Sequence, residues 1–346
     1  MSCSDWRGSR MKRNPRIDFI KGVAIITVVI GHCWTIDKSL FNFIYSFHMP
    51  LFFCISGYLF SNRAPFKEFV ISKAKALLIP YVFYFTCSYL CTVLILKTPR
   101  TVPQFLIGML LGGSYCSKFF NTPLWYLPLF FISLIAFYWL LKIDRPIIKY
   151  AVIISGALIS IPFNKLLFAL FPDKLTPFNI QALLPSLFFM FVGYELKRVD
   201  MAKIKARLTP YAFYAVILLM FGAGMLLSKN NTDQIISLFM TYEFYIYPLL
   251  IMPLIMTVCY NTRNRQIEII GANSITILGF HRLILHIFSD TFGFEERFVI
   301  TGANNFVLTM VFSVFCIFII CAGKVAYARV KKLAKIQLRN LLKPNT

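Results

Sequence analysis

Three ionisable side chains, those of Asp18, Lys21 and His32, stand within or beside one apolar run near the start of the chain and are candidates for chemistry. Lys21 and His32 are eleven residues apart, which in an α-helix is three turns plus about 20°, so both side chains point the same way. Their axial separation is about 16 Å at 1.5 Å per residue. Asp18 precedes Lys21 by three positions and can pair with it. His48 lies in the next apolar segment, after a short connection, so we expect the imidazoles of His32 and His48 to lie at a similar depth in a membrane.

The two imidazoles could share a proton or bind a metal. No carboxylate or cysteine of suitable spacing completes a ligand set, so the pattern favours proton transfer and no metal is expected. For Lys21 an alternative stays open, in which its side chain extends to the inner membrane surface with Asp18 as its partner. His32 lies too deep in its apolar segment for that explanation.

A second group of polar residues lies late in the chain. His281 and Arg282 are adjacent within an apolar segment, and His286 follows about one turn later. An arginine inside a membrane span requires a buried partner or a water-filled cavity. Glu243 or a substrate phosphate would serve as that partner. His281 and Arg282 are therefore candidate substrate-binding residues, and for His281 a structural role is the alternative.

The composition indicates a membrane protein. Of 346 residues, 58% are apolar or aromatic and only 14% are charged, against about 25% charged in soluble domains. The mean hydropathy is +0.69. The net charge of +22 does not indicate a nucleic-acid partner, because the basic residues gather in short loops between apolar segments. That distribution is typical of positive-inside topology.

The apolar segments predict an all-α, polytopic fold with about ten transmembrane helices. The predicted spans are 17–36, 43–61, 76–96, 122–141, 148–164, 179–196, 210–228, 243–260, 270–289 and 304–324. With the N-terminus in the cytoplasm, 26 basic residues fall on the inner side and 8 on the outer side, which predicts that both termini are cytoplasmic. Residues 102–115 are apolar but too short to span, and we expect a re-entrant or interfacial helix there.

One membrane domain accounts for most of the chain. We expect a basic cytoplasmic N-terminal tail over 1–16, the membrane domain over 17–324, and a basic amphipathic tail over 325–346 on the cytoplasmic leaflet. The first apolar run is long and carries charged residues, so it is interpreted as a retained helix and not as a signal peptide. None of the 9 cysteines forms a CxxC pair, and we expect no disulfide framework.

Five motifs in order along the chain resemble acyltransferase family 3, the membrane-bound acyltransferases that modify glycans. The family's first helix carries a basic residue, ten further residues and a histidine, which Lys21 and His32 match. The other four motifs of this chain are also similar to segments of the family. They are FHMPLFFCISGY (residues 47–58), SKAKALLIPY (residues 72–81), PLWYLP (residues 123–128) and GANSITILGFH (residues 271–281). The residues FHMPLFF of this second motif are similar to those of the fucose O-acetylase-like members.

The resemblance implies an acetyl-CoA-dependent O-acyltransferase of the bacterial inner membrane. Its acceptor would be a cell-surface polysaccharide or a lipid-linked saccharide precursor. Lys21, with Lys73 and Lys75, would hold the donor's phosphates at the inner side, while the pantetheine arm reaches His32. His32 would act as a general base or as a transient acyl carrier, and His48 would orient it or relay protons. Substrate contacts are expected from Ser56, Trp125, Tyr126, His281 and Arg282.

A different class of function also fits parts of this pattern. A secondary transporter or flippase for a glycan or lipid-linked sugar would share the proline-bent helices and buried charges. The chain lacks the repeated halves with matching broken helices that many transporters show. A purely structural membrane subunit would leave His32, His48 and Arg282 unexplained. The sequence leaves the acyl group, the acceptor sugar and the formation of a homo-oligomer open.

Overall fold

The computed structural model describes residues 14–33, 35–36, 38–171, 176–199, 210–229, 242–292 and 303–341. This part of the chain is helical and contains no strand, which confirms the all-α prediction. Most of the basic N-terminal tail, the basic loop over 200–209 and the last residues of the C-terminal tail lie outside the described residues.

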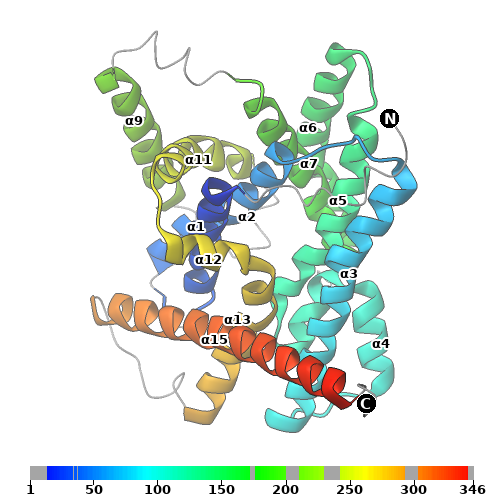
Figure 1. The fold of residues 1–346 in the computed structure, drawn as a ribbon. Helices are drawn as coiled ribbons and strands as arrows, with labels where there is room; N and C mark the ends of the chain where they lie inside the picture. Colours follow the sequence, from blue (N-terminus) through cyan, green and yellow to red (C-terminus); the bar gives the residue numbers. More distant parts are fainter. Residues whose placement is uncertain are drawn as a thin grey trace.

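The helices follow one another closely along the chain (Figure 1). They are α1 (Pro15–Gly31), α2 (Lys38–Tyr58), α3 (Phe66–Leu90) with a π-helical turn η2 (Cys91–Ile95), α4 (Val102–Leu111), η3 (Gly113–Phe119), η4 (Thr122–Trp125), α5 (Tyr126–Leu140), α6 (Pro146–Leu170), η5 (Pro177–Ala182), α7 (Leu183–Leu196), α9 (Pro210–Lys229), α11 (Glu243–Asn261), α12 (Arg265–Ala272), α13 (Ser274–Phe292) and α15 (Ala303–Leu341).

Several of these helices are long and apolar enough to cross a bilayer. Within the described residues there are six such helices, or seven if the bent pair α12–α13 forms one span. Each of the ten predicted spans falls on a helix, but α1 and α11 have only 17 and 19 residues, close to the lower limit for crossing about 30 Å of hydrocarbon. The structure therefore supports a multi-pass membrane protein, and the count of ten and the cytoplasmic termini stay predictions.

The boundaries between the first two helices differ from the prediction. The first helix ends at Gly31 and not at residue 36, and the second begins at Lys38 and not at residue 43. After Gly31 the described residues Cys33 and Thr35 are buried outside the helix, and the Thr35 hydroxyl bonds the Thr309 hydroxyl at 2.7 Å. Hydropathy cannot separate such a segment from a helix, because both are buried.

The predicted span 270–289 is also wrong in its first residues. The chain bends by 80° between α12 and α13, where the Asn273 side chain donates to the carbonyl of Ile269 at 2.7 Å. An asparagine side chain that bonds the backbone in this way competes with helix continuation. The bend places α12 against the N-terminal half of α1, whereas α13 packs on α15, α1 and α3 (Figure 1).

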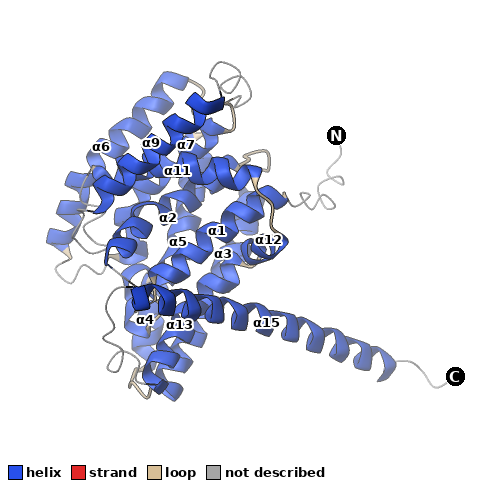
Figure 2. Ribbon diagram, turned by 90° about the vertical axis from the view of Figure 1, so that its left-hand side faces the viewer, coloured by secondary structure: helices blue, strands red, loops and turns tan. Residues whose placement is uncertain are grey.

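The last helix is longer than the span predicted to end at residue 324. Helix α15 runs without a break over 39 residues, and its C-terminal part projects from the bundle (Figure 2). Lys324 lies at the predicted boundary, where its ammonium donates to the Thr276 hydroxyl at 3.1 Å. The expected basic tail is thus a continuation of the same helix, and its place on the cytoplasmic leaflet stays a prediction.

Helix α1 lies in the middle of the bundle and packs on α12, α2, α11 and α13 (Figure 1). Glycines allow the closest of these approaches. A Cβ atom on Gly22 would collide with the carbonyl oxygen of Ile267, and one on Gly271 would collide with the carbonyl oxygen of Asp18. Small residues commonly permit such backbone contact between membrane helices. The approach fixes α1, and with it Lys21 and His32, against α12.

Candidate functional site

A small cavity lies between the C-terminal end of α1, the middle of α2, the short helix η4 and the N-terminal parts of α11 and α13. Its volume is about 40 Å³, room for a few water molecules and well below the ~300–1,000 Å³ typical of ligand pockets. It is lined by Val28, His32, Tyr45, His48, Met49, Thr122, Pro123, Trp125, Phe244 and Leu278. Substrates would have to displace some of these side chains to meet beside the imidazoles.

The imidazole of His32 is held at both of its nitrogens. Its Nδ1 lies 2.8 Å from the carbonyl oxygen of Val28, and its Nε2 lies 3.3 Å from the hydroxyl of Tyr45. A carbonyl can only accept, so Nδ1 carries the proton in the neutral ring and Nε2 presents a lone pair. The Tyr45 hydroxyl then donates to that lone pair. The basic atom of His32 therefore faces the cavity.

The backbone of His32 is held by a residue from the opposite end of the chain. Because α1 ends at Gly31, the carbonyl of His32 has no place in a continuing helix. The Arg282 guanidinium supplies the hydrogen bond that a further helical turn would have given: its Nη1 donates to the His32 carbonyl oxygen at 2.6 Å. A cation is also favourable at a helix C-terminus. Arg282 thus positions His32 from α13.

Two further histidines near His32 have the same hydrogen bond from Nδ1 to a helix carbonyl. The Nδ1 atoms of His48 and His281 lie 2.8 Å from the carbonyl oxygens of the residues four positions earlier. Both rings therefore present Nε2 as an acceptor when neutral. The rings of His281 and His32 meet edge to face with centroids 5.1 Å apart, and among the described atoms Nε2 of His281 has no hydrogen-bond partner.

The structure thus brings His32, His48, His281 and Arg282 together, although the sequence analysis placed them in two separate groups. His286, one turn beyond Arg282, does not line the cavity, and its ring centroid lies 5.0 Å from that of Phe120. His281 is fully buried, and it packs against His32 without lining the cavity. In this conformation His281 therefore cannot contact a substrate directly.

Lys21 lies at the other end of α1. Its ammonium is 3.9 Å from the Asp18 carboxylate, and 31% of its side chain is exposed. The helix is continuous from Lys21 to Gly31, so the expected separation from His32 of about 16 Å holds. A cation and an imidazole thus mark the two ends of the central helix, as the spacing predicted.

The other two predicted donor-binding lysines lie on a different part of the bundle. Lys73 is half-buried, with its ammonium 5.3 Å from the centre of the Phe69 ring, and Lys75 is exposed. Their helix, α3, packs mainly on α5 and α13, whereas α1 packs on α12 and α2. The structure therefore places these two lysines on α3 without joining them to Lys21.

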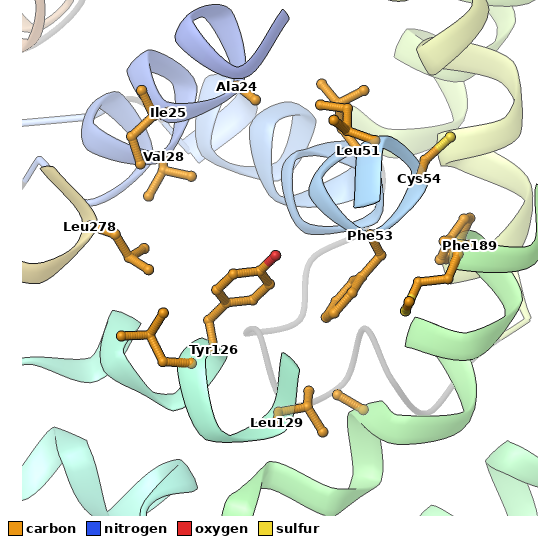
Figure 3. Packing of buried hydrophobic residues seen from close by; sticks show 14 of the residues in the cluster. Ala24, Ile25, Val28, Leu51, Phe53, Cys54, Tyr126, Leu129, Phe189 and Leu278 are labelled. Carbon is orange, nitrogen blue, oxygen red and sulfur yellow. The ribbon is translucent and has the colours of Figure 1, made fainter. Parts of the chain in front are cut away.

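The predicted substrate-binding residues of α2, η4 and α5 lie close together beside the cavity. Trp125 lines the cavity, and the Tyr126 phenol interacts with the hydroxyl of Ser56. In Figure 3, Tyr126 lies between Leu278 and Phe53, with its hydroxyl on the side of α2. Ser56 also donates to the carbonyl of Phe52 at 2.7 Å. Trp125 is thus the member of this group that faces the cavity.

Tyr45 is a residue of the candidate site that the sequence did not single out. It stands in an aromatic stretch, FNFIYSF, that is typical of ordinary packing between membrane helices. Its spacing from His48 is three residues, which places both on one face of α2. That spacing was the available signal, but the contact with His32 depends on how α1 and α2 cross.

The chain resembles known proteins over most of its length. It matches the family described as an acyltransferase domain over residues 14–323. The nodulation protein NolL of Sinorhizobium fredii is 44% identical over 85 residues, which are 21% of this chain and 23% of that protein. NolL of Mesorhizobium japonicum is 29% identical over 177 residues, which are 46% of this chain and 44% of that protein.

Each alignment thus spans less than half the length of the curated relative. No solved structure matches the chain. The family match, in contrast, includes both ends of α1 and the whole histidine cluster. The chain belongs to acyltransferase family 3, and its long apolar helices are those of a multi-pass membrane protein.

Proposed function

We propose that this protein transfers an acetyl group from cytoplasmic acetyl-CoA to a hydroxyl of a cell-surface polysaccharide or of its lipid-linked precursor. The observation that carries the proposal is the fixed tautomer of His32. Its Nδ1 is occupied by the Val28 carbonyl, and its Nε2 lone pair faces the cavity. A base held in this way can remove a proton from an alcohol.

The arrangement of α1 supports a long anionic donor. CoA carries phosphates at one end and its thioester at the end of a thin pantetheine arm. Lys21 provides a partly exposed cation at one end of α1, and His32 stands about 16 Å away at the other end. A donor that lies along α1 would thus place its phosphates at Lys21 and its thioester at the cavity. Lys73 and Lys75 would add positive charge at the same side of the membrane.

The acceptor would enter from the side of η4. Trp125 lines the cavity there, and an indole ring offers a flat apolar face against which a sugar ring can stack. We place His48 beside His32 as a second acceptor of protons, and Ser56 and Tyr126 behind Trp125 as polar support for the acceptor. The relatives from Sinorhizobium and Mesorhizobium are bacterial proteins, which supports a bacterial inner membrane as the location.

The experiment is a transfer assay with acetyl-labelled acetyl-CoA in membranes that contain the protein and the host's glycans. We expect label to appear on glycan as an alkali-labile ester, and we expect none in membranes without the protein. Succinyl-CoA in a parallel reaction tests the choice of acyl group. If the protein adds no label from either donor, the proposed donor and acceptor are wrong.

A further inference from the structure

We infer that Tyr45 is a catalytic residue whose hydroxyl donates a hydrogen bond to the oxyanion that forms when the acyl group is transferred. The inference rests on the proposed function and names a residue outside the five family motifs. It comes from the position of the Tyr45 hydroxyl, which lies against the basic atom of His32 inside the cavity.

The Tyr45 side chain is buried and held in place. Only 6% of the residue is exposed. Its ring stacks on Phe41 with centroids 4.0 Å apart and meets the edge of His48 at 4.7 Å. These contacts restrict the ring without using the hydroxyl. A donor that is fixed before the substrate arrives needs no reorganisation during the reaction, which is the property that oxyanion stabilisation requires.

The hydrogen bond between Tyr45 and His32 is long enough to be exchanged. Its length of 3.3 Å exceeds the usual 2.7–3.2 Å of bonds that involve nitrogen. An acceptor hydroxyl that donates to Nε2 of His32 would take the place of the Tyr45 hydroxyl. The displaced Tyr45 hydroxyl then needs a new acceptor close to the same substrate oxygen, and the carbonyl oxygen of the acyl group stands there.

The imidazoles of the cavity cannot supply this hydrogen bond. Nδ1 of His32 and of His48 is directed to a helix carbonyl, and each neutral ring offers only a lone pair at Nε2. Thr122 and Trp125 also carry donors, but they belong to η4 on another wall of the cavity. Tyr45 is the donor in contact with Nε2 of His32, the atom that takes the proton of the acceptor hydroxyl.

The acyl transfer then has two stages, addition of the acceptor and loss of the thiol. Nε2 of His32 accepts the proton of the acceptor hydroxyl while that oxygen forms a bond to the acyl carbon of the thioester. The carbonyl electron pair moves to oxygen, and the Tyr45 O–H donates to that oxyanion. When the pair returns, the carbon–sulfur bond breaks and the proton on His32 passes to the sulfur. The products are the acyl ester and CoA with a free thiol.

The test compares Tyr45→Phe with Tyr245→Phe in purified full-length protein. Tyr245 is the matched control, because its buried hydroxyl donates to Ser160 at 2.8 Å, between α11 and α6. Release of the CoA thiol from acetyl-CoA is measured with the host's glycan extract. Loss of one oxyanion donor lowers kcat by about 10²–10³-fold, so we expect such a loss for Tyr45→Phe, with KM for acetyl-CoA nearly unchanged. Tyr245→Phe should keep its kcat.

Three results would overturn the inference: a kcat close to that of the wild type, a loss confined to KM, or an equal loss in Tyr245→Phe. If the wild type itself transfers nothing, the proposed function fails instead. A second variant, with 3-fluorotyrosine at position 45, keeps the side chain's shape but has a more acidic phenol. A stronger donor to the oxyanion raises kcat. A hydroxyl that only held Nε2 of His32 would lower kcat instead, because it would compete better with the acceptor.

Discussion

The guanidinium of Arg282 donates to the main-chain carbonyl of His32 at 2.6 Å, across 250 residues of sequence. The contact links the end of the central helix to α13, and it explains why an arginine is placed among apolar residues. Arg282 is therefore a positioning residue. Its charge fixes where α1 ends, and thus where the His32 ring enters the cavity.

We expect Arg282→Leu to impair both stability and activity. Loss of a buried hydrogen bond to a charged group costs about 1.5–3 kcal/mol, which should lower the melting temperature of the purified protein in detergent. A shift of about 1 Å at a catalytic group can cost 10²-fold in rate. Arg282→Lys keeps a cation and should give an intermediate kcat. If Arg282→Leu retained full kcat, Arg282 would not position His32.

Lys21→Ala is expected to weaken binding of the donor and to leave the chemical step nearly intact. Lys21 is about 16 Å from His32 along α1 and would contact only the phosphates. We therefore expect KM for acetyl-CoA to rise about tenfold, equal to about 1.4 kcal/mol, with little change in kcat. Lys118→Ala, which changes an exposed lysine of η3, is the matched control. An equal effect of both substitutions would remove Lys21 from the donor site.

Gly57→Ala should destabilise the contact between α2 and α7. A Cβ at this position would collide with the carbonyl oxygen of Met190, whereas one at Gly323 would meet nothing within 4 Å. Overpacking typically costs about 1–3 kcal/mol, and backbone cannot move aside as a side chain can. Thermal unfolding in detergent should show a clear loss for Gly57→Ala and almost none for Gly323→Ala. Similar melting temperatures would contradict this packing.

Direct transfer from the thioester to the acceptor predicts that both substrates bind before any product leaves. Initial rates measured over a grid of both substrate concentrations should then give intersecting double-reciprocal lines. Parallel lines would indicate a ping-pong mechanism with a covalent intermediate. In that case His32 would carry the acyl group itself, the alternative that its sequence position also allows.

The helices could be predicted from the sequence, because long apolar runs are a strong signal, and so could the pairing of Lys21 with Asp18. The end of α1 at Gly31 could not, since Cys33 and Ile36 continue the apolar run and Cys33 and Thr35 are buried although they lie outside the helix. The contact of Tyr45 with His32 could not be predicted from the sequence either. It depends on the crossing of α1 and α2, and a tyrosine in an aromatic run is ordinary in a membrane helix.

Acetyl transfer by His32→Ala, compared with His286→Ala, tests the central claim most directly. Both residues are histidines near the cavity end of the bundle, but His286 contacts Phe120 and lies outside the cavity lining. With matched amounts of protein in the membrane, we expect His32→Ala to lose transfer to the level of membranes without the protein. His286→Ala should stay close to the wild type. Equal transfer by His32→Ala and the wild type would show that the base is not His32, and would contradict the proposed mechanism.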